Sequence, residues 1–314
     1  MRQRRHRAAG EIRKNAQFLL IGKGHDLRCP TVSADVRGEA LPLRTTRRRP
    51  AGRHRSPDRL SVPSDAPALV LAIPGAASAA SENIGAGIAA SASSSCPGVM
   101  VRAGYLEGER DNLAAVLAGL PRGGAGHWRA AVVVPLLTGP HPSADAALAA
   151  ALAKAGVLAV LTGHLGPHPL LGEALHARLA QAGLARAGRM RQINIVGAAD
   201  GVLMVVAGGP AGAGEAGMVA VLLAARLAVP VMPAALGDAA SLAEAVARLR
   251  QARATRLALA PCVIGPEADI GELAATAAET GAACAQPLGA HPALGRLVAI
   301  RYGAALQDPR IALS

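Results

Sequence analysis

A carboxylate and a histidine each follow a short apolar run of this sequence, and together they could handle a metal ion and a proton. Glu107 comes just after the run 99–105, and His141 follows the run 130–137. Imidazole binds borderline divalent metals, and a carboxylate can accept a proton. A His or Asp at a helix start also serves as a cap, so these two residue types alone leave a structural role open.

The pattern around these residues predicts alternating strands and helices. From residue 66 onward, short apolar runs alternate with Ala/Leu-rich stretches, which is typical of βα units that build a parallel sheet. The strands expected first are 68–73, 99–105, 130–137 and 157–162, with helices at 79–90, 111–120, 143–154 and 169–181. Since the carboxyl ends of parallel strands lie at one edge of a sheet, we expect Glu107 and His141 to converge there.

A second set of elements repeats the first in order and spacing. Its expected strands are 201–207, 229–235, 256–262 and 282–286, and its helices are 214–227, 241–251, 270–280 and 292–306. Short strings repeat as well: Leu-Gly-Pro-His-Pro at 165–169 corresponds to Leu-Gly-Ala-His-Pro at 288–292. The sequence therefore predicts an internal duplication. We expect a doubly wound α/β protein of two parallel-sheet halves, 66–184 and 201–308, with a connector at 185–200 and a cleft between the halves.

The positive charge of the chain is concentrated at its amino-terminal end. Residues 1–65 hold 16 of the 33 Lys and Arg but 6 of the 21 Asp and Glu, so they carry +10 of the net +12. This segment shows no sustained hydrophobic period and predicts a disordered basic tail. Nucleic-acid binding is expected only through this tail, because aromatic residues for base stacking are scarce.

Cysteine usage and hydropathy favour a cytoplasmic protein. The four cysteines, which include no C-x-x-C pair, fit a reducing cytoplasm without a disulfide framework. The most apolar stretch, 218–236, is interrupted by Arg226, Pro230 and Pro233 and falls short of the about 20 apolar residues of a membrane span. We therefore expect no membrane partner. A homodimer is compatible with the sequence.

Several strings taken together resemble a known family. They are Leu69-Val70-Leu71-Ala72 before a Gly-containing loop, Gly104-Tyr105-Leu106-Glu107, Val132 to Leu137 followed by Gly-Pro-His141, and the strings at 165–171 and 287–292. In this order they resemble the tandem-repeat sirohydrochlorin chelatases of the CbiX/SirB type, over residues 66–308. The resemblance implies a lyase that inserts Co²⁺ or Fe²⁺, as substrate, into the tetrapyrrole sirohydrochlorin in cobalamin or sirohaem biosynthesis. It implies no organic cofactor.

The resemblance also assigns roles to residues. His141 matches the metal-binding histidine after the third strand, and Glu107 matches the carboxylate after the second, which would bind metal and accept a proton. Asp145 matches an acidic residue one helical turn beyond His141, and Gly75 lies in the loop after the first strand. Gly75 and Asp145 are expected beside the bound tetrapyrrole.

One position departs from the family pattern. The His-Gly-Ser loop after the first strand is replaced by Pro74-Gly75-Ala76, and proline can neither bind a metal nor transfer a proton. The position that corresponds to His141 in the second half is Glu267. A catalytically degenerate homologue that binds tetrapyrrole or metal without chelatase activity is therefore the alternative.

Other residues admit simpler interpretations. Gly212 to Gly217 fits the G-x-G-x-x-G pattern of dinucleotide sites, although the turn before it is longer than that fingerprint requires. His168 and His291 occupy equivalent repeat positions and are expected to cap helices. His164 and His176 have the character of ordinary surface or helix residues.

Overall fold

The computed structural model describes residues 60, 62–63, 66–121, 131–185 and 198–308. All of them belong to one compact unit, Arg53–Ser314. The predicted basic tail lies almost entirely outside the described residues, and so do most of the predicted connector and the beginning of the third predicted strand.

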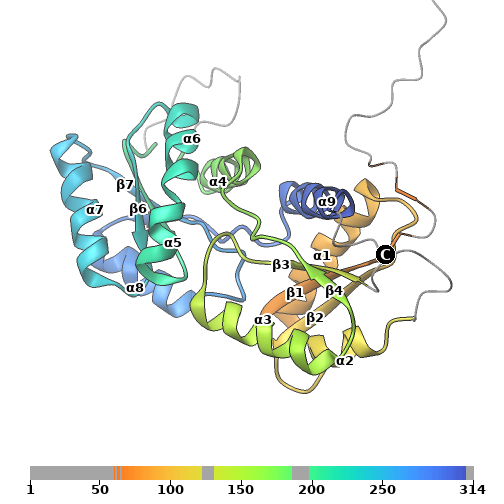
Figure 1. Cartoon of the computed structure of the whole chain (residues 1–314). Helices are drawn as coiled ribbons and strands as arrows, with labels where there is room; N and C mark the ends of the chain where they lie inside the picture. Colours follow the sequence, from red (N-terminus) through yellow and green to blue (C-terminus); the bar gives the residue numbers. More distant parts are fainter. Residues whose placement is uncertain (1–59, 61, 64–65, 122–130, 186–197, 309–314) are drawn as a thin grey trace, which may run out of the picture. The chain divides into compact units, whose positions relative to one another are not determined.

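Two four-stranded parallel sheets confirm the predicted α/β duplication (Figure 1). The first sheet has the order β2-β1-β3-β4 and the second the matching order β6-β5-β7-β8. Their strands are β1 (Ala68–Ala76), β2 (Val101–Glu107), β3 (Ala131–Pro135), β4 (Ala159–Leu161), β5 (Gly201–Val206), β6 (Val231–Ala235), β7 (Leu257–Pro261) and β8 (Ala283–Cys284). The central strands are apolar without alternation because helices cover both of their faces.

Helices follow the strands in both halves, close to their predicted positions. They are α1 (Ala79–Ser95), α2 (Leu113–Ala118), α3 (Pro142–Ala155), α4 (Pro169–Gln181), α5 (Gly209–Glu215), α6 (Gly217–Leu227), α7 (Ala239–Gln251), α8 (Ile270–Thr280) and α9 (Pro292–Leu306). The prediction of one helix over 214–227 is wrong, because α5 and α6 meet at Ala216 with a bend of 49°. Pro210 starts α5 early, and glycines weaken the helix around the break.

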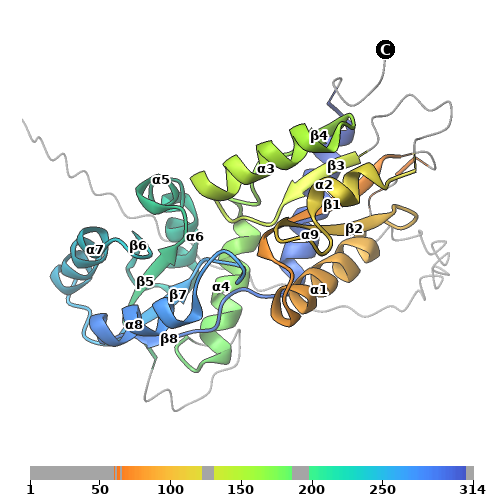
Figure 2. The same ribbon diagram turned by 90° about the horizontal axis from the view of Figure 1, so that it is seen from below.

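The two halves exchange their last helices. The helix α4, from the first half, packs against α6 and β7, whereas α9, from the second half, packs against α1 and β3. Figures 1 and 2 show α4, in green, beside α6, and α9, in blue, against the first sheet, and the two helices also pack against each other. One continuous core joins the inner face of each sheet to these helices, and separate clusters lie on the outer faces under α2–α3 and α7–α8. Each inner sheet face is thus buried partly by the other half.

Residues at equivalent positions of the internal repeat form the polar contacts of the exchanged helices. Arg178 and Arg301 each lie ten residues after a repeated histidine, His168 or His291. The Nε and Nη2 atoms of Arg178 donate to the carbonyl of Leu288, at 3.1 and 2.5 Å. Nη2 of Arg301 donates in the reciprocal direction, to the carbonyls at 165 and 166, at 3.3 Å each. The hydrogen bonds from each exchanged helix to the opposite half are therefore equivalent under the internal duplication.

An ion pair joins the exchanged helices to each other. Nη2 of Arg296 on α9 lies 2.6 Å from Oε1 of Glu173 on α4, and both side chains are about one-third exposed. Each residue lies five positions after its repeated histidine, so the pair is formed by equivalent positions. Such a partly exposed pair adds less to stability than the apolar core around it.

A glycine lets α9 approach α1 closely. A Cβ atom at Gly295 would lie 2.3 Å from Cβ and 2.9 Å from the backbone carbon of Ser91. Farther along α9, the buried hydroxyl of Tyr302 donates to the carbonyl of Pro67 at 2.6 Å, and burial raises the pKa of this phenol. The helix α9 therefore packs closely against the first half and is hydrogen-bonded to it.

Among the described residues, no single helix is long and apolar enough to cross a membrane. The bent pair α5 and α6 meets the length and composition criteria only when both helices are taken together.

The glycine contact predicts a stability effect. Replacing Gly295 with Ala should lower the free energy of unfolding by about 1–3 kcal/mol, because α9 must move away from α1. Urea denaturation measures this change. Gly214→Ala is the matched control, since no atom of the described residues lies near its Cβ position, and it should change stability by less than about 1 kcal/mol. Equal effects of the two changes would contradict the packing described.

The caps of the exchanged helices predict a pH dependence. The Nδ1 atoms of His168 and His291 accept backbone N–H groups at 3.1 and 3.2 Å. Burial first, and the neighbouring cations Arg301 and Arg178 second, lower the pKa of these rings. The unfolded chain therefore takes up protons at higher pH than the folded chain, and stability should fall as the pH drops below about 6.5.

Urea denaturation at about pH 7.5 and about pH 5.5 measures this loss, which should stay below about 1 kcal/mol per cap because both rings are partly exposed to solvent. The double variant His168→Asn/His291→Asn keeps a capping side chain that does not titrate, so it should lose less stability over the same interval. An unchanged pH dependence in the double variant would show that these caps do not titrate with folding.

Candidate functional site

A cavity of about 410 Å³ lies where the carboxyl ends of the two sheets face each other. The first half contributes the end of β1 and the start of α1, and the second half contributes the loops after β7 and β8. Across it, a Cβ atom at Gly75 would lie 3.6 Å from the carbonyl oxygen of Pro266, and one at Gly265 would lie 3.0 Å from Cδ1 of Ile84. The predicted ligand-side loop, Pro74 to Ala76, therefore does face the second half.

The walls of this cavity are mainly apolar. Its polar side chains are Ser78, Ser81, Arg178 and Gln286, and its lining residues include no His, Cys, Asp or Glu. The two serine hydroxyls already satisfy the first turn of α1, since each accepts the backbone N–H of the other, at 3.2 and 2.9 Å. The cavity thus offers apolar surface and one cation rather than a set of metal ligands.

Glu107 lies beside this cavity without lining it. It ends β2, its register partner on β1 is Ala76, and its side chain is exposed. No hydrogen bond or ion pair joins Glu107 to His141 among the interactions of the described residues. The predicted convergence of the two residues therefore stays a prediction.

His141 and Asp145 do lie together, at the start of α3. His141 is the N-cap of this helix, and its Nδ1 lies 3.4 Å from the backbone nitrogen of Ala144. Asp145 accepts the backbone N–H of His141 at 3.0 Å and, through its other oxygen, pairs with Nε2 of His164 at 2.8 Å. Asp145 thus contacts the imidazole of His164 and the backbone of His141, while the ring of His141 caps α3.

Sequence reasoning missed His164. It follows β4 by three residues, so the same rule that selected Glu107 and His141, a polar side chain after a parallel strand, would have selected it. Among the described residues, no group of three or more His, Cys, Asp or Glu side chains has an arrangement that would hold a metal ion as it stands.

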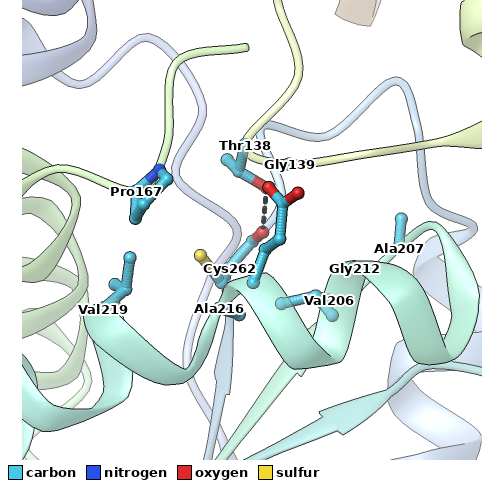
Figure 3. A pocket seen from close by; sticks show the side chains of 10 residues that line it. Thr138, Gly139, Pro167, Val206, Ala207, Gly212, Ala216, Val219 and Cys262 are labelled. Atoms are coloured by element: carbon cyan, nitrogen blue, oxygen red, sulfur yellow. Dashed lines mark hydrogen bonds between the residues drawn. The ribbon is translucent and has the colours of Figure 1, made fainter.

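The segment before His141 packs tightly against the second half. The hydroxyl of Thr138 donates to the carbonyl of Cys262 at 2.7 Å, as Figure 3 shows. The space beside this bond has a volume of about 10 Å³, which is room for about one water molecule. Burial raises the pKa of the Cys262 thiol to about 12, so it is not a thiolate donor near neutral pH. We call this contact, between residues 138–140 and the second half at Gly208 and Cys262, the seam; it is a packing contact rather than a ligand site.

Glu267, which corresponds to His141 in the repeat, holds its own loop. Its carboxylate accepts the backbone N–H groups of Ile264 at 2.5 Å and Gly265 at 2.9 Å. Burial is the main influence on its pKa, which is raised despite these hydrogen bonds. The side chain turns back toward the end of β7 and shapes one wall of the cavity through Gly265.

The G-x-G-x-x-G string lies against protein rather than open space at its first glycine. A Cβ atom at Gly212 would lie 2.6 Å from the carbonyl oxygen of Ala207 and 3.3 Å from that of Pro140. The oxygen of Pro140 also approaches the Cβ position of Gly208, the N-cap of α5, to 1.9 Å. These glycines permit close packing of the two halves, which accounts for their presence without a dinucleotide.

The fold defined by these two exchanged halves is that of solved chelatase structures. The chain is similar to SirB from Bacillus subtilis with Fe³⁺, with a TM-score of 0.60 and 15% identity. It is also similar to the sirohydrochlorin chelatase SirB from Bacillus subtilis subspecies spizizenii in complex with cobalt, with a TM-score of 0.53 and 16% identity. Each alignment covers 79% of this chain and all of the other. At this identity the likeness establishes the fold.

Comparisons of the sequence itself found no match. No protein-family model and no curated protein matches this chain.

The packing at the seam predicts different roles for two adjacent glycines. Gly208 has φ of +93° and a Cβ position in contact with Pro140, so Gly208→Ala should cost about 3 kcal/mol or more. Gly209 also has a positive φ, +70°, but no atom of the described residues lies within 4 Å of its Cβ position. Gly209→Ala should therefore cost only about 1–2 kcal/mol. Urea denaturation of both variants tests the seam, and a smaller loss for Gly208→Ala would contradict it.

Proposed function

We propose that this protein binds an anionic tetrapyrrole in the cavity between its two halves. The observation that carries the proposal is the cavity itself: about 410 Å³, apolar walls from both sheets, and Arg178 as the one charged residue of its lining. This volume falls within the range of about 300–1,000 Å³ of small-molecule sites. Apolar walls suit the faces of a macrocycle, and a cation suits its carboxylates.

The fold likeness supports the same ligand class. One of the similar solved structures is a sirohydrochlorin chelatase, whose substrate is a tetrapyrrole with carboxylate side chains. In open parallel sheets, ligands bind beyond the carboxyl ends of the strands, and this cavity lies beyond the carboxyl ends of β1 and β7. The fold likeness and the cavity therefore support the same class of ligand and the same site.

Insertion of Co²⁺ or Fe²⁺ into the bound tetrapyrrole is the second candidate function. It is favoured by the pairing of the His164 imidazole with Asp145, one helical turn beyond His141, because imidazole and carboxylate suit these metals. In this reading His141 binds the metal ion as substrate, Asp145 orients it, and Glu107 accepts a proton released by the macrocycle. Binding without insertion is favoured by Pro74, which lines the cavity at the position of the family's other histidine and offers neither a ligand nor a base.

An anaerobic absorbance titration with sirohydrochlorin tests the proposal. We expect a saturable spectral change as the tetrapyrrole enters an apolar cavity, and we expect Ile84→Glu, which places a carboxylate on the cavity wall, to weaken binding at least about tenfold. Val221→Glu is the matched control, because Val221 is exposed on α6 and should leave the affinity unchanged. No saturable change with the wild-type protein would refute tetrapyrrole binding.

Adding Co²⁺ or Fe²⁺ to the complex separates the two candidates. Binding without chelatase activity predicts insertion at the uncatalysed rate in both the wild type and His141→Ala. Catalysed insertion predicts a faster wild-type rate that falls about 10²–10⁴-fold when this imidazole is removed.

A further inference from the structure

Arg178 is a cation whose charge no carboxylate of the described residues balances. It lies on α4 and lines the cavity, and its three hydrogen bonds go to neutral acceptors: the carbonyl of Leu288 twice, and Oε1 of Gln181 from Nη1 at 2.9 Å. Among the ion pairs of the described residues, none includes this guanidinium. A guanidinium has five N–H groups, so two of them, one on each terminal nitrogen, are left for a ligand.

The surroundings of Arg178 make its charge costly in the absence of a ligand. The residue is half-buried, and burial lowers the pKa of the guanidinium. An anion that binds beside a partly desolvated cation offsets the free-energy cost of burying its unpaired charge. The hydrogen bonds to Leu288 hold the guanidinium in a fixed orientation, which favours recognition of a planar carboxylate.

The internal repeat supplies a comparison within the same chain. Arg301 occupies the equivalent position on α9 and donates to the equivalent loop, at Leu165 and Gly166, yet it does not line the cavity. Holding the loop of the other half therefore does not require exposure to the cavity. Arg178 has a second feature, its position on the cavity wall, that its repeat partner lacks.

We propose that Arg178 binds a carboxylate of the ligand and makes the cavity selective for anionic macrocycles. This assignment rests on the proposed function, because it names the residue that would recognise the side chains of the tetrapyrrole. Its role is to bind and orient the ligand. The assigned contact is a pair of N–H groups on one carboxylate, at the edge of a macrocycle whose faces lie on the apolar walls.

Two porphyrins of opposite charge test the assignment on the full-length protein. Uroporphyrin carries carboxylates, and tetrakis(N-methylpyridyl)porphyrin carries positive charges. Arg178→Gln should weaken uroporphyrin binding about 10- to 100-fold, the range for loss of a hydrogen bond to a charged group, and should not weaken binding of the cationic porphyrin. Arg301→Gln should change neither affinity more than about threefold, because it removes a comparable loop contact away from the cavity. All variants share the same basic amino-terminal segment, so that segment does not account for a difference between them.

A second pair of variants keeps the test valid if the Arg→Gln variants fail to fold. Arg178→Lys and Arg301→Lys keep the charge but replace the guanidinium with an ammonium, which cannot form two parallel N–H bonds with one carboxylate. Arg178→Lys should bind uroporphyrin several-fold more weakly and Arg301→Lys should bind it unchanged. Urea midpoints of every variant confirm that the compared proteins are folded.

The outcomes separate this assignment from the proposed function. If the wild type binds uroporphyrin and the Arg178 variants bind it equally well, or the Arg301 variants lose as much, the assignment is overturned while tetrapyrrole binding stands. If the wild type binds neither sirohydrochlorin nor either of the two porphyrins, the proposed function fails and the assignment fails with it.

Discussion

The exchange of α4 and α9 between the two halves is the constraint on which the rest of the structure depends. Each sheet has an inner apolar face that its own half covers incompletely, and the missing cover is a helix from the other half. The core is therefore continuous across both halves, and neither sheet can bury its inner face alone. Arg178, Arg301 and the Glu173–Arg296 pair add polar contacts at repeat-related positions. Burial supplies most of the stability here, and the polar contacts fix the alignment of the helices.

This exchange also determines where a ligand can bind. Because α4 and α9 hold the sheets with their carboxyl ends facing each other, the loops after β1 and β7 become opposite walls of one cavity. The same arrangement closes the neighbouring seam, where Pro140 packs on Gly208 and Thr138 bonds to Cys262. The loops after β1 and β7 are thus open and mainly apolar, whereas the loop after β3 is packed against the second half. The open loops present apolar surface and one cation, and none of the lining side chains is a His, Cys, Asp or Glu.

Much of this fold could be predicted from the sequence, because period and repeat are local properties. The apolar runs locate the strands, and the repeated Leu-Gly-x-His-Pro string locates the starts of α4 and α9. The exchange could not be predicted, since a helix has the same apolar stripe whether it packs on its own half or on the other. The bend at Ala216 and the contact of His164 with Asp145 were missed for different reasons. Pro210 and the glycines around the bend are visible in the sequence, whereas the contact of His164 depends on which loops after the strands lie close in space. The chemistry of Glu267 differs from that of His141, although they share a repeat position, because its carboxylate turns back onto the backbone of Ile264 and Gly265.

Amide hydrogen exchange, with and without sirohydrochlorin, tests most directly whether the cavity between the exchanged halves is the ligand site. Exchange reports the opening of individual segments, so it locates the ligand without changing any residue. The account predicts that sirohydrochlorin slows exchange in residues 74–84, 264–270 and 286–289, which form the two walls of the cavity. Slowed exchange confined to residues 139–145 and 162–166, around His141 and His164, would contradict it.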